Sequence, residues 1–385
     1  MTGLISRIEF NKPTMVGNEL KYIKQAINEY FAICGNGIFT KRCESFLQET
    51  FGIKRAMLTS SCTHALEMAA LLLDLQAGDE VIIPSYTFVS TINCFVLRGA
   101  IPVFVDIRED TLNIDERLIE EKISKRTKAI FAVHYAGVSC EMDSIMKLAK
   151  KHNLYVVEDA AQAFDSTYQD KTCGAIGHMG AYSFHETKNC ICGEGGALLI
   201  NDEGFIERAE YIREKGTNRN RFSQGLVDKY TWVDIGSSYL MSDMNAAFLL
   251  AQFEKHKQIL ERRRSIFDRY YEAFRELEKQ GEMRLPVMPS HCTHNAHMFY
   301  VILNSTRERD SLIKFLRQRN IEAVFHYIPL HTSPMGIKLS KRSVSLPVTE
   351  DLAYRLLRLP IYYSLRDDEA DRIIDAVYIW NSSKH

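Results

Sequence analysis

Short strand-like runs alternate with amphipathic helical segments through the first 240 or so residues, and this alternation limits the possible folds more than any other feature of the sequence. The strand-like runs are rich in β-branched and other apolar residues and lie at 55–60, 80–85, 102–107, 129–135, 154–159, 181–184 and 196–202. Most are apolar at consecutive positions, as in strands buried on both faces of a parallel sheet. The pattern predicts an α/β domain with a mainly parallel seven-stranded sheet.

A change of pattern at Asp243 predicts where this domain ends. From there to about residue 280, apolar side chains recur at three- and four-residue steps, as in a long helix. Beyond Pro286, apolar runs and helical segments alternate again over shorter distances. We therefore expect a large α/β domain over residues 1–242, followed by a connecting helix and a smaller α+β domain over residues 243–385.

Charge and cysteine content argue against several kinds of partner. The 385 residues include 48 Lys and Arg and 49 Asp and Glu, and the formal net charge of −1 gives no electrostatic reason to expect nucleic acid or an anionic membrane as a partner. No apolar run has the length that crosses a bilayer, and the N-terminus lacks the core of a signal peptide. The nine cysteines have no repeating spacing and are expected to be reduced. These features predict a cytoplasmic protein.

Three polar features stand where an open α/β sheet places its ligands. Asp159 ends a predicted strand, the hydroxyl-rich segment 60–63 joins a strand to a helix, and Lys188 lies between apolar segments and the glycine-rich turn 193–196. Taken singly, the first two would serve as helix caps and the lysine as a surface charge. Together, a phosphate cradle, a strand-end carboxylate and a lysine made nucleophilic by burial are the parts that pyridoxal phosphate requires.

A metal site and a nucleotide loop are the alternatives in the same region. His185, Cys190, Cys192 and Glu194 are of metal-ligand type, but Cys-x-Cys is not the usual knuckle spacing and no second pair occurs. The segment 174–180 is glycine-rich, yet its spacing is not G-x-G-x-x-G and no convincing strand precedes it. We therefore expect neither a metal site nor a dinucleotide-binding dehydrogenase.

Several motifs resemble, in the same order, those of the DegT/DnrJ/EryC1/StrS family of sugar aminotransferases. They are PSYTFVSTIN at 84–93, VVEDAAQ at 156–162, SFHETKN at 183–189 followed by GEGG, and HYIPLH at 326–331. The resemblance extends from about Phe10 to the C-terminal helix. It implies a fold-type-I aminotransferase with pyridoxal 5'-phosphate as cofactor, L-glutamate as amino donor and a homodimer with shared active sites.

The resemblance also implies a reaction. The variants HYAGVSCEMD, SFHETKN, IREKGTNR, DKYTW and IGSSYLMSD imply amination of the 4-keto carbon of dTDP-4-dehydro-6-deoxy-D-glucose, giving dTDP-4-amino-4,6-dideoxy-D-galactose for a surface glycan such as the O-antigen of lipopolysaccharide. The gluco epimer of the product and amination of a 3-keto isomer stay open. A sugar 3-dehydratase would carry histidine in place of Lys188, and a protein that binds without turnover would not need both Lys188 and Asp159.

The roles of individual residues follow from the same resemblance. Lys188 matches the lysine that forms a Schiff base with the cofactor, and Asp159 matches the carboxylate that faces the pyridine nitrogen. Further cofactor contacts are implied for Cys62, Thr63, Phe88, Gln162, Ser183 and Ser238. Ser238 stands where many relatives supply an asparagine from the neighbouring subunit, so this chain departs from the pattern there. The segment that resembles a substrate-facing one contains His326, Tyr327 and His331.

Overall fold

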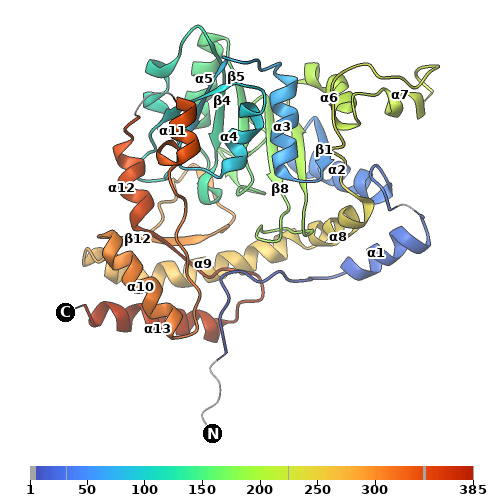
Figure 1. Ribbon diagram of the computed structural model, residues 1–385. Helices are drawn as coiled ribbons and strands as arrows, with labels where there is room; N and C mark the ends of the chain where they lie inside the picture. The colour runs from blue at the N-terminus through green and yellow to red at the C-terminus, as the bar shows by residue number, and fades with distance from the viewer. Residues whose placement is uncertain (1–5, 32, 224, 341–343, 385) are drawn as a thin grey trace.

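The computed structural model describes residues 6–31, 33–223, 225–340 and 344–384, and a seven-stranded sheet forms the centre of its larger part (Figure 1). The strand order is β1-β9-β8-β5-β4-β2-β3. Only β9 runs against its neighbours, while the pairs β2–β3, β2–β4, β4–β5 and β5–β8 are parallel. The strands are β1 (Arg55–Thr59), β2 (Glu80–Pro84), β3 (Ile101–Val105), β4 (Thr127–Val133), β5 (Tyr155–Asp159), β8 (Met179–Ser183) and β9 (Gly196–Ile200). The mainly parallel sheet expected from the sequence is confirmed.

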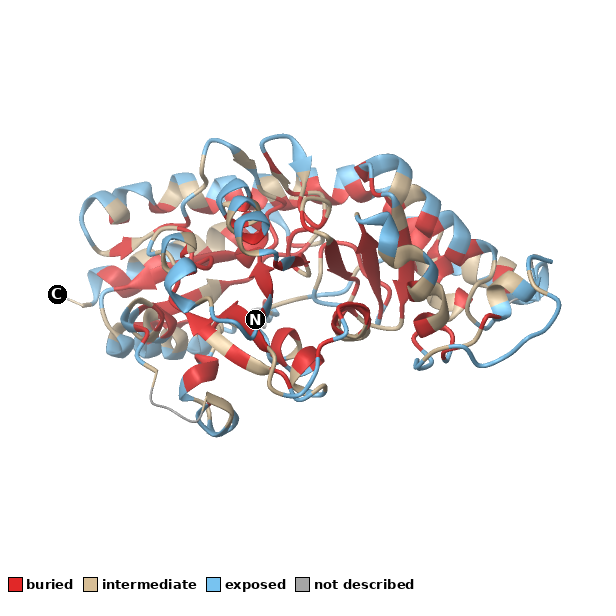
Figure 2. Cartoon of the chain, turned by 90° about the horizontal axis from the view of Figure 1, so that it is seen from above, coloured by how far each residue is buried: buried red, intermediate tan, exposed pale blue. Residues whose placement is uncertain are grey.

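Helices cover both faces of this sheet because successive strand residues point to opposite sides. Met57 and Val81 pack against the helices of one face, whereas Leu58 and Ile82 pack against those of the other. Figure 2 shows the result, with strands coloured as buried and outer helix surfaces as exposed. The first face carries α3 (Cys62–Leu72), α4 (Val89–Val96) and α6 (Ile206–Arg213); the second carries α1 (Glu19–Asn28), α2 (Ile38–Phe51), α5 (Met142–His152) and α8 (Asp243–Glu254).

A smaller three-stranded sheet, with strand order β10-β12-β13, organises the C-terminal part. Its strands are β10 (Met283–Arg284), β12 (Phe299–Leu303) and β13 (Leu356–Leu359), and its helices are α9 (His256–Lys279), α10 (Thr306–Gln318), α12 (Pro347–Arg355) and α13 (Asp367–Ser382). A third sheet joins β6 (Thr167–Tyr168) and β7 (Lys171–Thr172) of the large part to β11 (Cys292–Thr293). Short helices α7 (Arg219–Ser223) and α11 (Pro334–Ser340) and 3₁₀ turns at Glu116–Leu118, Glu120–Lys122, Tyr135–Gly137, Glu203–Phe205 and Leu330–Thr332 complete the described elements.

The long helix expected from residue 243 is two helices in the structure. Lys255, between α8 and α9, has a backbone conformation (φ −114°, ψ 8°) outside the helical range. The apolar residues of α8 pack with α1 and α2 in the core of the large part, whereas Ile266 and Phe267 of α9 pack in the core of the small part. Ile8 also packs in the small-part core, although it lies near the N-terminus. From this packing we propose a domain boundary near Lys255 rather than after residue 242.

Within the described residues, no helix combines the length and apolar character that a membrane span requires.

Glu158 and Asp159, adjacent on β5, point to opposite faces of the sheet. The Glu158 side chain is fully buried and accepts hydrogen bonds from the backbone N–H groups of Gly174 (2.7 Å), Ile176 (2.7 Å) and Gly177 (2.5 Å). It also pairs with His134 Nε2 at 2.8 Å. The glycine-rich segment 174–180 therefore wraps a carboxylate of its own chain, which explains why it resembles an anion-binding loop without being one for a nucleotide.

Replacing Glu158 with glutamine is expected to lower the free energy of unfolding by about 3–5 kcal/mol. One carboxylate oxygen becomes an NH2 group, which is a donor and leaves a buried N–H group without an acceptor. Urea unfolding followed by circular dichroism would measure the loss. Glu49→Gln, at an exposed position of α2, is the matched control and should change it by less than about 0.5 kcal/mol. Equal midpoints for the two variants would contradict a structural role for this carboxylate.

Candidate active site

A cavity of about 570 Å³ opens where strands of the large sheet end, between the two parts of the molecule. Val133, Asp159 and Ser183, the last residues of the parallel strands β4, β5 and β8, all line it. This is the edge at which open α/β sheets bind ligands. Of the residues singled out from the sequence, the cavity gathers Cys62, Thr63, Phe88, Asp159, Gln162, Ser183, Lys188, His326 and Tyr327.

The first turn of α3 forms part of the cavity wall. Ser61 caps this helix, its Oγ accepting a hydrogen bond from the N–H of His64 at 3.1 Å, and the Thr63 hydroxyl donates to Ser90 Oγ at 2.8 Å. Strand β9 packs so closely here that a Cβ on Gly196 would lie 2.3 Å from the backbone nitrogen of Cys62. A glycine is therefore required, and the first turn of α3 presents hydroxyls and N–H groups suited to phosphate.

Asp159 is a buried residue of the same cavity and is held by neutral donors. Its Oδ2 accepts from the hydroxyl of Thr91 at 2.7 Å, and its Oδ1 accepts from the backbone N–H of Ala161 at 3.1 Å. Thr87 supports Thr91 through a 2.8 Å contact between their hydroxyls. Among the described residues, no arginine or lysine forms a salt bridge with this carboxylate. It thus combines the cap-like contact and the cavity position that the sequence left as alternatives.

Lys188 lines the same cavity. Burial lowers the pKa of Lys188, although the nearby Cys62 and Asp159 act in the opposite direction. A lower pKa increases the fraction of neutral amine at a given pH, and the neutral amine is the form that attacks a carbonyl or accepts a proton. Its position in the cavity and its lowered pKa suit this lysine to act as a nucleophile or a base.

His297, which the sequence did not single out, lines the cavity in a defined tautomer. Asn189 Nδ2 donates to the carbonyl of Asn295 at 2.7 Å, so Asn189 Oδ1 is the acceptor that faces His297 Nδ1 at 3.0 Å. The proton of a neutral imidazole therefore lies on Nδ1, and Nε2 is left as an acceptor. Burial lowers the pKa of His297 well below its usual value, and the positive charge of Lys188 adds to this effect. His297 is thus neutral and offers a hydrogen-bond acceptor at Nε2.

Aromatic and amide side chains form the remaining wall. Gln162 is fixed at both ends, since its Oε1 accepts from the N–H of Ala136 at 2.7 Å and its Nε2 donates to the Tyr327 hydroxyl at 3.0 Å. His326 Nδ1 lies 3.1 Å from the Tyr135 hydroxyl. Phe88 is 56% exposed, so it is a wall of the cavity and not part of the core. This wall can hold a flat ring.

The structure does not bring His331 into the cavity. The imidazole is buried, with Nδ1 2.6 Å from Ser85 Oγ and Nε2 3.0 Å from a carboxylate oxygen of Glu350. Its role is to fasten the segment 326–331 to the end of β2 and to α12. The expectation that His331 faces the substrate is corrected accordingly, because the segment turns after Tyr327 and the 3₁₀ turn Leu330–Thr332 carries the histidine into the interior.

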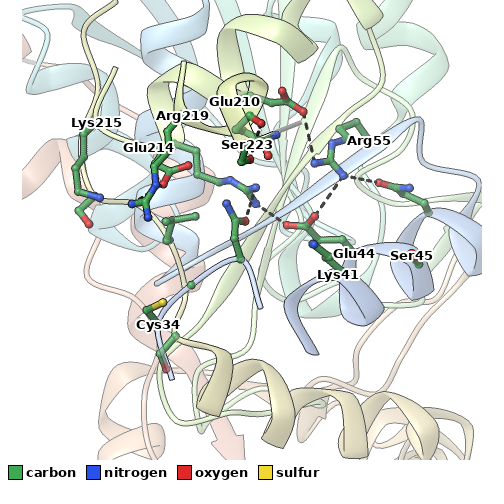
Figure 3. Close-up of a pocket in the computed structure, with 18 residues that line it drawn as sticks. Cys34, Lys41, Glu44, Ser45, Arg55, Glu210, Glu214, Lys215, Arg219 and Ser223 are labelled. Carbon is green, nitrogen blue, oxygen red and sulfur yellow. Dashed lines mark hydrogen bonds and ion pairs between the residues drawn. The ribbon is translucent and has the colours of Figure 1, made fainter. Parts of the chain in front are cut away.

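Ser238 is also not among the residues that line the cavity of Lys188. It is exposed, and it lines a separate pocket of about 720 Å³, shown in Figure 3, whose wall includes Cys34, Glu44, Arg55 and Arg213.

The two cysteines beside Lys188 pack in the protein core. Cys190 and Cys192 are buried with apolar neighbours such as Phe184, and burial raises the pKa of both thiols. Across the part of the chain that the structure describes, no group of three or more His, Cys, Asp or Glu side chains is arranged to hold a metal ion.

Comparison with known proteins agrees with this geometry. The model of the DegT/DnrJ/EryC1/StrS aminotransferase family matches residues 13–378. GDP-perosamine synthase from Escherichia coli O157:H7 is 32% identical over 97% of this chain and 98% of that protein, and the spore coat polysaccharide biosynthesis protein SpsC from Bacillus subtilis (strain 168) is 33% identical over 96% of each. The solved PLP form of the putative sugar aminotransferase Spr1654 from Streptococcus pneumoniae superimposes with a TM-score of 0.90 at 25% identity, covering 98% of this chain and 99% of that one.

Proposed function

Because the chain belongs to the DegT/DnrJ/EryC1/StrS aminotransferase family, we propose that it aminates a specific keto sugar. At the level of the family it is a sugar aminotransferase that uses pyridoxal phosphate. The proposed reaction moves the amino group of L-glutamate to C4 of dTDP-4-dehydro-6-deoxy-D-glucose, giving dTDP-4-amino-4,6-dideoxy-D-galactose. The observation that carries the proposal is the meeting of Lys188, Asp159 and the first turn of α3 in one cavity.

The residues present fit the cofactor. The first turn of α3, with Thr63 and Ser183, would hold the phosphate, and Phe88 would lie against the ring. Asp159 would face the pyridine nitrogen. Gln162, whose amide is fixed at both ends, would lie near the ring hydroxyl. When bound, pyridoxal phosphate supplies an electron sink for the carbon that loses its proton.

The protein's own groups then bind, orient and move protons. Lys188 Nζ takes the proton from the carbon of the amino donor and returns a proton to the sugar carbon, which its lowered pKa favours. Asp159 is kept in position by Thr91 and Ala161 and would balance positive charge on the ring nitrogen of the bound cofactor. His326 and Tyr327, in the wall formed by the small part, are proposed to contact the sugar.

The choice of sugar rests on the sequence variants that resemble dTDP-4-amino-4,6-dideoxygalactose transaminase. GDP-perosamine synthase is named for a GDP-linked sugar. The nucleotide and the identity of the sugar are therefore the parts of the proposal that the following experiment tests. The alternatives are the 4-amino-4,6-dideoxy-D-glucose epimer and amination of a 3-keto isomer.

Incubation of the purified protein with pyridoxal phosphate, L-glutamate and dTDP-4-dehydro-6-deoxy-D-glucose should yield one amino sugar. Proton NMR would report the aminated carbon from the chemical shifts, and small couplings at H4 would report the galacto configuration. Large couplings would indicate the gluco epimer. Conversion of the GDP-linked ketone in preference to the dTDP-linked one would contradict the proposed nucleotide.

We also propose that the active unit is a homodimer with shared sites. Support comes from the exposed position of Ser238, which does not line the cavity of its own chain, at the place where many relatives supply an asparagine from the neighbouring subunit. The cytoplasm remains the proposed compartment because all nine cysteines are free. A product of this class would enter a surface glycan such as an O-antigen of lipopolysaccharide.

A further inference from the structure

Arg358, on β13 of the small part, reaches the cavity of Lys188 and has no anionic partner there. Among the described residues no carboxylate forms a salt bridge with its guanidinium and no side-chain or backbone acceptor hydrogen-bonds it. Its Nε is buried without a hydrogen-bond partner. Its Cζ lies 4.6 Å from the ring centre of Phe10, which supplies an aromatic face and no negative charge.

An arginine in this position requires an anion. The guanidinium stays charged in proteins, and a buried cation without a partner is strongly destabilising. Burial lowers the pKa of Arg358, and the groups that oppose this effect are three tyrosines (Tyr86, Tyr135 and Tyr327), none of which is an anion at neutral pH. A bound ligand with a negative charge would supply the missing partner of Arg358.

The carboxylates of the cavity do not meet this need. Asp159 is engaged by Thr91 and Ala161, and it forms no salt bridge with Arg358 and is not among the groups that act on the pKa of Arg358. Glu194 has a side chain that is 69% exposed and lies 3.7 Å from His185. The cofactor phosphate does not meet this need either, because the first turn of α3, in the large part, would hold that phosphate.

Two reactants could bring the missing anion: the amino donor carries carboxylates and the sugar nucleotide carries a diphosphate. The planar fork of arginine matches a carboxylate with two parallel hydrogen bonds. The α-carboxylate is attached to the same carbon as the amino group, so it must lie beside Lys188 during transfer. The positive charge of Arg358 is near enough to contribute to the lowered pKa of Lys188. A diphosphate is separated from the reacting C4 by the sugar ring and would lie farther away.

We propose that Arg358 forms a carboxylate subsite that binds the α-carboxylate of the amino donor. The inference rests on the proposed function, since it presupposes an α-amino acid as donor. In this proposal the small part recognises the amino donor, and the large part binds the cofactor.

Arg358→Gln, loaded with pyridoxal phosphate, should require at least about 30-fold more L-glutamate than the wild type to half-saturate the change in cofactor absorbance. Arg358→Lys keeps the charge but loses the fork, and should lie between the two. Half-saturation by dTDP-4-dehydro-6-deoxy-D-glucose, measured on the aminated enzyme, should stay within about threefold of the wild type for both. The matched control is Arg355→Gln, three residues away, whose arginine contacts Asp351 and the carbonyl of Leu303 outside the cavity.

Simpler amines identify the carboxylate that is bound. L-2-aminobutyrate keeps the α-carboxylate and 4-aminobutyrate lacks it, so Arg358→Gln should slow the reaction of the first compound and not that of the second. Binding of 2-methylglutamate, which has no α-proton to lose, provides a calorimetric readout that does not depend on turnover, and it should weaken in Arg358→Gln but not in Arg355→Gln.

Unchanged L-glutamate dependence in a folded Arg358→Gln would overturn the subsite. So would a loss confined to the sugar nucleotide, which would assign the arginine to a phosphate. If Arg358→Gln does not fold, Arg358→Lys is measured instead, and a wild-type dependence on L-glutamate in that variant would also overturn the subsite. A wild-type protein whose cofactor absorbance does not respond to L-glutamate would reject the proposed function and the subsite together, and this appears before any substitution is made.

Discussion

Replacing Lys188 with alanine is expected to lower kcat for amino transfer by at least about 10⁴-fold. Two capacities are lost at once, because the amine both attaches the cofactor and carries the proton between carbon atoms. No other lysine lines the cavity as far as the chain is described, so no neighbour replaces it. The measurement is the rate of amino-sugar formation at saturating L-glutamate and keto sugar.

Lys171→Ala is the matched control for this experiment, since Lys171 is exposed on the short strand β7. It should leave the rate unchanged. The first turn of α3 and the Asp159 carboxylate remain in Lys188→Ala, so this variant should still bind the cofactor without a covalent bond. A rate within about tenfold of the wild type would remove Lys188 from the centre of the mechanism.

Replacing Asp159 with asparagine is expected to lower kcat by about 10³-fold while the protein stays folded. The amide can still accept from Thr91 or from the N–H of Ala161 through its oxygen, so the local packing is kept. The negative charge facing the pyridine nitrogen is lost, and with it the electrostatic support for the electron sink.

The rate and the absorbance spectrum of the bound cofactor should change together in Asp159→Asn. Asp170→Asn, at an exposed position, should change neither. A fully active Asp159→Asn would mean that the carboxylate only caps the chain after β5, which is the plainer role its contact with Ala161 also allows.

The large sheet and most of the cavity could be predicted because both are encoded locally. Each strand is a short apolar run, and the residue at its carboxyl end is at the ligand-binding edge once the sheet is parallel, as for Asp159 and Ser183. Glycines around Lys188 were also informative, since Gly196 is required by the close approach of β9 to α3. Apolar periodicity could not show the break at Lys255, because the pattern continues across it while the two helices pack in different cores.

The contributions of the small part could not be predicted from local pattern. Arg358 lies on a four-residue strand, β13, and His297 lies two residues before β12, so neither has neighbours in sequence that indicate a site. Both become cavity residues only when the two parts pack together. The opposite error occurred at His331, where the sequence suggested a substrate contact and tertiary packing turned the side chain towards Ser85.

The central claim is that Lys188 bears the cofactor, and reductive trapping tests it most directly. Borohydride treatment of the protein loaded with pyridoxal phosphate, followed by peptide mass mapping, should place one phosphopyridoxyl group on the peptide that contains Lys188. Prior addition of L-glutamate should prevent the labelling, because the amino donor releases the lysine. Stoichiometric labelling of a different lysine, or label on Lys188 that L-glutamate does not remove, would contradict the account.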